Sequence, residues 1–261
     1  AHHHLWNFRA GSVEECYLLD DFLRDTSSGH NIVSTVFIEC GAMFKADGPT
    51  SMRPIGETEF ANGVAAMSAS GHYGNTRVAA AIVGTVDLTL GNAVPVVLEA
   101  QMAAGGGRFR GIRHAATWHE DSRIANHRTD PPPGLLMNKA FRSGFAHLAT
   151  FGLTFEAWCY HTQLHEVIHL ARQFPETLIV LDHLGGPLGV GPYSDQAAAV
   201  FLEWDRAMTE LAACDNVVAK LGGLAMEVNG FNWHRLPAPP TSDDLLKGCA
   251  HYYERTIELF G

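Results

Sequence analysis

The sequence opens with two histidines whose spacing suits a shared metal ion. His2 and His4 are two residues apart, and side chains with this spacing on a β-strand lie on the same face. Two imidazoles at one strand end supply half of a site for zinc or a similar divalent ion. A purification tag also begins with histidines, but three are few for a tag, and Leu5-Trp6 follow directly.

A third histidine, His183, follows a short apolar run that predicts a buried strand of a parallel sheet. Two glycines and Pro187 then end the strand and start a loop. We expect His2, His4 and His183, and more loosely His161, to meet at one rim of an α/β structure. The alternative for His183 is a histidine satisfied by hydrogen bonds at a strand end. Asp182, its neighbour on the strand, is expected to point to the opposite face and to support the site or cap a helix.

His165-Glu166-Val167-Ile168-His169 matches the His-Glu-x-x-His signature of zinc proteases. An apolar stripe must turn toward the sheet, and it consists of Leu164, Val167, Ile168 and Ala171. We therefore expect His165 and Glu166 near the solvent-facing side of a helix and disfavour a protease. No Gly-x-Ser-x-Gly motif is present, which disfavours a serine hydrolase.

Strand and helix patterns alternate along the chain, which predicts an α/β protein with parallel crossovers. The expected strands span 31–39, 77–86, 109–113, 153–158, 177–182 and 216–221. The expected helices span 12–26, 57–70, 93–104, 135–149, 163–173, 195–213 and 241–260. The first helix would begin at a capping box, Ser12 to Glu15.

If 1–5 ends a further strand, the chain has seven strand–helix units. We expect a single domain over 1–261, a (β/α)8 TIM barrel incomplete at both ends, with its eighth strand absent. The two outer strands should then not pair with each other. An open doubly wound sheet is the structural alternative, but no Gly-x-Gly-x-x-Gly follows the early strands.

Composition excludes several classes of partner. The chain has 261 residues and a formal net charge of -10 without a basic stripe, which argues against a nucleic-acid partner. It has no apolar run of roughly 20 residues, which argues against a membrane span. Its five scattered cysteines indicate reduced thiols and a cytoplasmic location. Whether the chain forms a homo-oligomer is left open.

Four motifs in this order resemble the amidohydrolase superfamily of the amidohydrolase-2 type: 1–6 (Ala-His-His-His-Leu-Trp), 111–114 (Gly-Ile-Arg-His), 160–164 (Tyr-His-Thr-Gln-Leu) and 180–187 (Val-Leu-Asp-His-Leu-Gly-Gly-Pro). The similarity runs over nearly the whole chain, and its closest branch contains sugar-acid lactonases and 2-pyrone-4,6-dicarboxylate lactonase. It implies a (β/α)8 barrel that hydrolyses a lactone or related ester of a small molecule, with a divalent ion such as zinc or manganese.

The resemblance implies roles for particular residues, by position. The metal ligands would be His2, His4, His183 and, as a looser match, His161; the catalytic residues His183 and Arg113; and the substrate-binding residues Arg113, His114, Trp118, Tyr160 and Lys220. Arg113 could instead form a salt bridge at the rim, and Trp118 could be a solvated loop residue. The family's eighth-strand aspartate has no counterpart here, so two alternatives stand beside the hydrolase: a metal-dependent decarboxylase and a barrel without activity.

Overall fold

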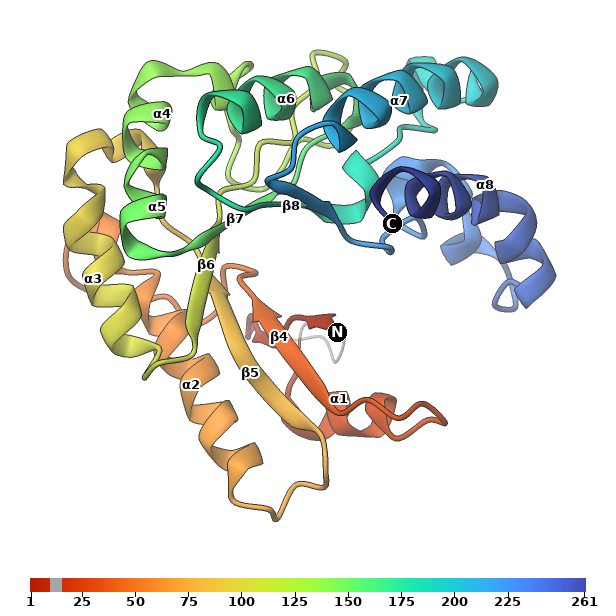
Figure 1. The fold of residues 1–261 in the computed structure, drawn as a ribbon. Coiled ribbons are helices and arrows are strands. Elements are labelled where there is room, and N and C mark those ends of the chain that lie inside the picture. The colour runs from red at the N-terminus through yellow and green to blue at the C-terminus, as the bar shows by residue number, and fades with distance from the viewer. Residues whose placement is uncertain (10–15) are drawn as a thin grey trace.

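The computed structural model describes residues 1–9 and 16–261 and contains a curled sheet of seven parallel strands (Figure 1). Its strands, in spatial order, are β1 (His2–His3), β4 (Ser34–Ile38), β5 (Arg77–Gly84), β6 (Phe109–Arg113), β7 (Thr154–Ala157), β8 (Ile179–Leu181) and β9 (Val217–Ala219). Spatial order follows chain order, so each strand–helix unit adds one strand to the same edge. This confirms the α/β class and the expected seventh unit.

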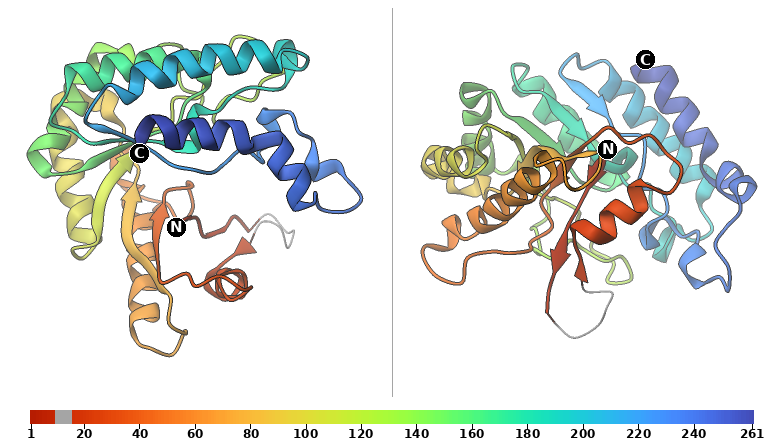
Figure 2. Two further views of the ribbon diagram at one scale, coloured as in Figure 1. Left: turned by 45° about the vertical axis from the view of Figure 1, so that its right-hand side comes forward. Right: turned by 90° about the horizontal axis from the view of Figure 1, so that it is seen from below.

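Helices alternate with the strands and lie along the outer side of the curled sheet (Figure 2). They are α1 (Leu19–Thr26), α2 (Ile55–Ala69), α3 (Val94–Ala104), α4 (Lys139–Phe145), α5 (His147–Phe151), α6 (Leu164–Gln173), α7 (Ala197–Ala212) and α8 (Ser242–Phe260). Within the residues described, no helix has the length and apolar character needed to cross a membrane.

Two local predictions need correction. The helix expected over 135–149 is divided into a 3-10 turn, α4 and α5. The helix expected from 12 begins at Leu19, and the capping box Ser12 to Glu15 lies outside the described residues. Before α1, β2 (Trp6–Asn7) pairs antiparallel with β3 (Cys16–Tyr17) in a small second sheet that the sequence patterns did not indicate.

The core lies between the sheet and its helices. Phe37, Ile82, Ile112 and Phe155 are fully buried on four neighbouring strands, as expected for parallel strands covered on both faces. On α7, the indole Nε1–H of Trp204 donates to the carbonyl oxygen of Leu184 at 2.7 Å. The helix layer thereby fixes the turn that follows β8.

β1 and β9 are the outer strands of the sheet and, among the described residues, do not pair with each other. The curl nevertheless brings their ends close, because Lys220 Nζ lies 3.2 Å from His2 Nδ1. The sequence-based expectation was that these two strands would not pair with each other, and the structure agrees with it. The eight-stranded barrel and its missing strand stay predictions, since the parallel sheet of the described residues has seven strands.

Candidate active site

Histidine and charged side chains gather at the carboxyl ends of the strands, where α/β barrels carry their active sites. A cavity of about 640 Å³ opens there, and its lining includes His2, His4, Glu156, His183 and Lys220. These residues come from β1, β7 and the segments that follow β1, β8 and β9. The curl of the sheet therefore brings residues of the two outer strands, β1 and β9, to one cavity.

His2 and His4 face each other through their Nε2 atoms, which lie 3.0 Å apart. His4 Nδ1 lies 2.8 Å from the carbonyl oxygen of Ile38. A carbonyl only accepts hydrogen bonds, so His4 Nδ1 donates and its Nε2 keeps a free lone pair in the neutral ring. Two nitrogens that bind one zinc ion at about 2.0–2.1 Å are about 3.3 Å apart in tetrahedral geometry, and the observed separation fits such a pair.

Both imidazoles are held neutral, which is the form that binds metals. Burial, with Lys220 as the next cause, lowers the pKa of His2 to about 2. Burial and the neighbouring Arg113 lower the pKa of His4 to about 4. Neither ring therefore has to lose a proton near neutral pH before it coordinates an ion.

His183 completes a group of three imidazoles. Its ring centroid lies 5.3 Å from that of His2 and 4.9 Å from that of Trp158. Its backbone is left-handed, with φ 52° and ψ 39°, and a Cβ on Gly223 would lie 2.3 Å from its Nδ1. Burial lowers the pKa of His183 as well. The geometry brings His2, His4 and His183 together as expected, and their role as ligands stays a prediction.

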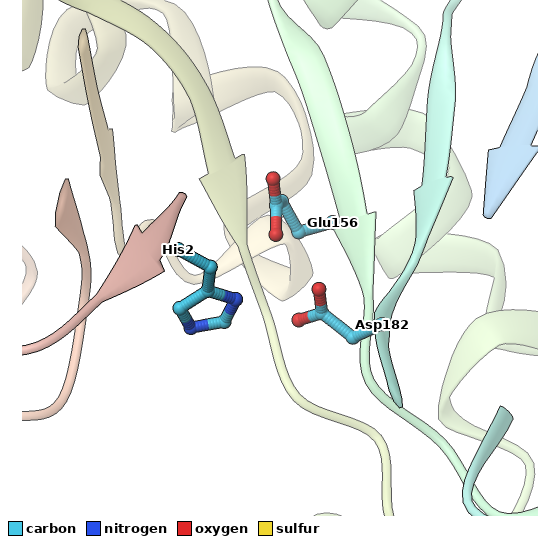
Figure 3. A group of neighbouring side chains, drawn as sticks. All are labelled: His2, Glu156 and Asp182. Carbon is cyan, nitrogen blue, oxygen red and sulfur yellow. The ribbon is translucent and has the colours of Figure 1, made fainter. Parts of the chain in front are cut away.

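Asp182 does not point away from the site, and the expectation that it would is wrong. β8 ends at Leu181, and Asp182 to Gly185 form a 3-10 turn in which His183 is left-handed, so strand alternation no longer applies. The Asp182 side chain turns toward His2 and Glu156 (Figure 3). Burial would raise the pKa of Asp182, but Lys220 and Arg113 hold it below its usual value.

Six side chains of alternating charge run along this rim, and we call them the charged row: Arg128, Glu39, Arg113, Asp182, Lys220 and Glu156. Arg113 Nε lies 2.7 Å from Glu39 Oε1, and Arg113 Nη1 lies 3.3 Å from Asp182 Oδ2. Arg128 Nη2 lies 2.9 Å from Glu39 Oε2. Arg113 is only 4% exposed. Its contacts are those expected if Arg113 forms salt bridges at the rim instead of binding substrate.

The sequence analysis did not identify Glu39 and Glu156 as site residues. Each is nevertheless an acidic residue within or directly after an apolar strand, which is a pattern that indicates a site. Glu156 stands inside the apolar strand β7 and is buried, as is Glu39 directly after β4. An acid within a buried strand needs a cation nearby. Burial and then Asp182 raise the pKa of Glu156 to about 8, and Lys220 is its ion-pair partner.

The remaining expected site residues lie elsewhere in the described structure, and none of the four lines the His2 cavity. The Leu188 N–H donates to His161 Nδ1 at 3.3 Å, and the Tyr160 hydroxyl donates to the carbonyl of Ala125. The Trp118 N–H donates to Gln163 Oε1 at 3.1 Å. His114 lines a second cavity of about 520 Å³, beside Thr85 and Asp87. Their substrate-binding or ligand roles stay predictions.

The His-Glu-x-x-His stretch lies on α6 and does not form a site. His165 and His169 are exposed, as the apolar stripe indicated. Glu166 is buried instead of near solvent, because its Oε2 accepts the backbone N–H of Leu136 at 3.2 Å. The expected orientation of Glu166 was wrong because this partner comes from a distant segment of the chain.

Comparison with known proteins identifies the family. The model of the family described as Amidohydrolase matches residues 1–261. The chain belongs to the amidohydrolase family. This agrees with the three imidazoles at the carboxyl ends of a curled parallel sheet.

Two relatives in sequence extend the comparison. An uncharacterized protein, y4mH, of Sinorhizobium fredii is 30% identical over 96% of this chain and 70% of its own length. L-fucono-1,5-lactonase of Burkholderia multivorans is 31% identical over 60% of this chain and 46% of its own length. This amidohydrolase-family chain thus resembles a lactonase over more than half of its residues.

Solved structures support the fold. An amidohydrolase of Burkholderia multivorans with bound zinc superposes with a TM-score of 0.69 at 24% identity, over 100% of this chain and 79% of that one. A protein of Pseudomonas putida named as a 2-pyrone-4,6-dicarboxylic acid hydrolase gives 0.56 at 13% identity, over 100% and 77%. At these identities the likeness concerns the barrel-like architecture.

Proposed function

We propose that this amidohydrolase-family chain opens a lactone or related ester of a small carboxylate-bearing molecule with the help of a divalent metal ion. The observation that carries the proposal is the convergence of three neutral imidazoles at the carboxyl end of the sheet. The similarity to L-fucono-1,5-lactonase supports lactones as the substrate class.

His2, His4 and His183 would hold the ion. When bound, a divalent ion polarises an ester carbonyl or lowers the pKa of a water molecule toward neutrality. The proposal rests on these three ligands, since His161 lies outside the cavity and contacts Leu188, Tyr193 and Glu203.

The chain's own side chains orient the reacting groups. The carbonyl of Ile38 fixes the ring of His4, and Trp158 packs edge-on against His183. Arg113 acts as a positioning residue, since it ties Glu39 to Asp182. Glu156 lines the same cavity, where its buried carboxyl group pairs with Lys220.

The test is an activity screen on chelator-treated protein with and without added zinc or manganese. The substrates are L-fucono-1,5-lactone, 2-pyrone-4,6-dicarboxylate, other sugar-acid lactones and aromatic acids. We expect metal-dependent lactone opening that His183→Ala abolishes and that His169→Ala, an exposed histidine outside the cavity, leaves intact. Release of carbon dioxide from the acids would instead indicate a decarboxylase, and no turnover by folded, metal-loaded protein would indicate an inactive barrel.

A further inference from the structure

The ammonium group of Lys220 sits among three side chains that could themselves hold a metal ion. His2, Glu156 and Asp182 present ligand atoms that all lie within 4.8 Å of one another (Figure 3). Lys220 Nζ lies 3.2 Å from His2 Nδ1 and 2.8 Å from Asp182 Oδ1, and it also donates to Glu156 Oε2. One positive charge therefore contacts all three members of the group.

The surroundings of this group make a cation necessary. Glu156 is 4% exposed and Asp182 is fully buried, and a buried carboxylate without a counter-charge is costly. Asp182 Oδ1 has Lys220 as its ion-pair partner but accepts no hydrogen bond among the described residues. The charge on this buried oxygen is therefore compensated by the ammonium group of Lys220.

One nitrogen and two carboxylate oxygens are ligands that suit manganese, zinc or similar divalent ions. The group shares His2 with the three imidazoles but lies on the other side of its ring: Nε2 of His2 faces His4, and Nδ1 accepts from Lys220. The structure therefore has two adjacent places for a cation, and the chain itself occupies one of them.

We propose that Lys220 is a built-in cation that occupies a second divalent-metal site formed by His2, Glu156 and Asp182, and thereby excludes a metal ion from it. An ammonium group has three N–H donors, and Lys220 has three partners in this cluster. Its ammonium group donates to His2 and Glu156 and forms an ion pair with Asp182, so this role differs from the substrate binding expected from sequence. While Lys220 is in place, no metal ion enters the group formed by His2, Glu156 and Asp182.

The test compares Mn²⁺ binding to the wild-type chain, Lys220→Met and Lys220→Arg by titration calorimetry and electron paramagnetic resonance. Methionine removes the charge with little change in length, whereas arginine keeps it. We expect Lys220→Met to bind one equivalent of Mn²⁺ more than the wild type, at least about tenfold more tightly than any such binding in Lys220→Arg. The additional equivalent should disappear in Lys220→Met/Glu156→Gln.

A thermal measurement keeps the test decisive if Lys220→Met is less stable. Loss of the ammonium group leaves two carboxylates without their cation, so saturating Mn²⁺ should raise the Tm of Lys220→Met by about 5 °C more than that of the wild type. The proposal is overturned if Lys220→Met gains neither the equivalent nor the Tm increase, or if the gain persists in the double variant.

Failure of the proposed function gives a different pattern. His4→Ala should weaken metal binding at the three imidazoles, because it removes the Nε2 atom that faces His2. In His4→Ala/Lys220→Met, the equivalent gained at Glu156 and Asp182 should remain. The number of Mn²⁺ ions bound by these variants can be compared even if the wild-type chain has no lactone activity.

Discussion

Gly223→Ala should damage the site far more than the fold. Gly223 has φ +86°, and an added Cβ would lie 2.3 Å from Nδ1 and 2.5 Å from Cγ of His183. Left-handed backbone costs a residue with a Cβ roughly 1–2 kcal/mol, which lowers the Tm of a chain of this size by about 2–8 °C. To restore ordinary contact the His183 ring must move by roughly 1 Å, and a misplacement of this size can reduce activity by about 100-fold.

The neighbouring Gly222 provides the control, because an added Cβ there meets nothing within 4 Å and the residue lines the same cavity. kcat/KM for the lactone found in the screen, zinc affinity and Tm are measured for both variants. Gly222→Ala should match the wild type in all three, and Gly223→Ala should lose both turnover and zinc affinity. If Gly223→Ala keeps activity within twofold of Gly222→Ala, the position assigned to His183 in the site is wrong.

Three further predictions concern buried polar groups. Burial and then Glu39 raise the pKa of Glu57 from 4.5 to about 7, so its contribution to stability is complete below pH 4.5 and is lost as the pH rises through 7. The loss is about 3 kcal/mol at about 1.4 kcal/mol per pH unit, and urea unfolding at pH 4.5 and 8 should show it in the wild type but not in Glu57→Gln. Trp204→Phe leaves the carbonyl of Leu184 without its donor and should lower the free energy of unfolding by about 1–3 kcal/mol; an unchanged urea midpoint would contradict this. Arg113→Lys should cost about 3 kcal/mol in the same assay, because one ammonium group cannot replace the buried fork of nitrogens, and a loss below 1 kcal/mol would show that the ion pairs are not needed.

Much of the fold could be predicted from sequence because its signals are local. Apolar runs such as that before His183 mark the parallel strands, and alternating helical stripes mark the layer outside them. The same local rules place His2 and His4 on one face of a strand, and parallel strands bring their carboxyl ends to one edge. The meeting of these histidines with His183 follows from the curl of the sheet.

The charged row could not be predicted because its contacts join distant strands. Arg113 and Glu39 are 74 residues apart in the chain, and only the curvature of the sheet decides which acid meets which base. Asp182 escaped prediction for a different reason: the strand ends one residue earlier than expected, and left-handed backbone at His183 replaces strand alternation. Tyr160 and His114 depend on the path of the long loop after β6, which no periodic pattern specifies.

The charged row holds three basic and three acidic side chains, and the imidazoles beside it are uncharged. The charged row and the imidazoles therefore bring no net charge of their own to this opening. A dication seated on the histidines would bring charge that no nearby side chain is available to neutralise. An anionic substrate would supply that balance itself, so selectivity for acids could arise from the ion without any unpaired arginine in the opening.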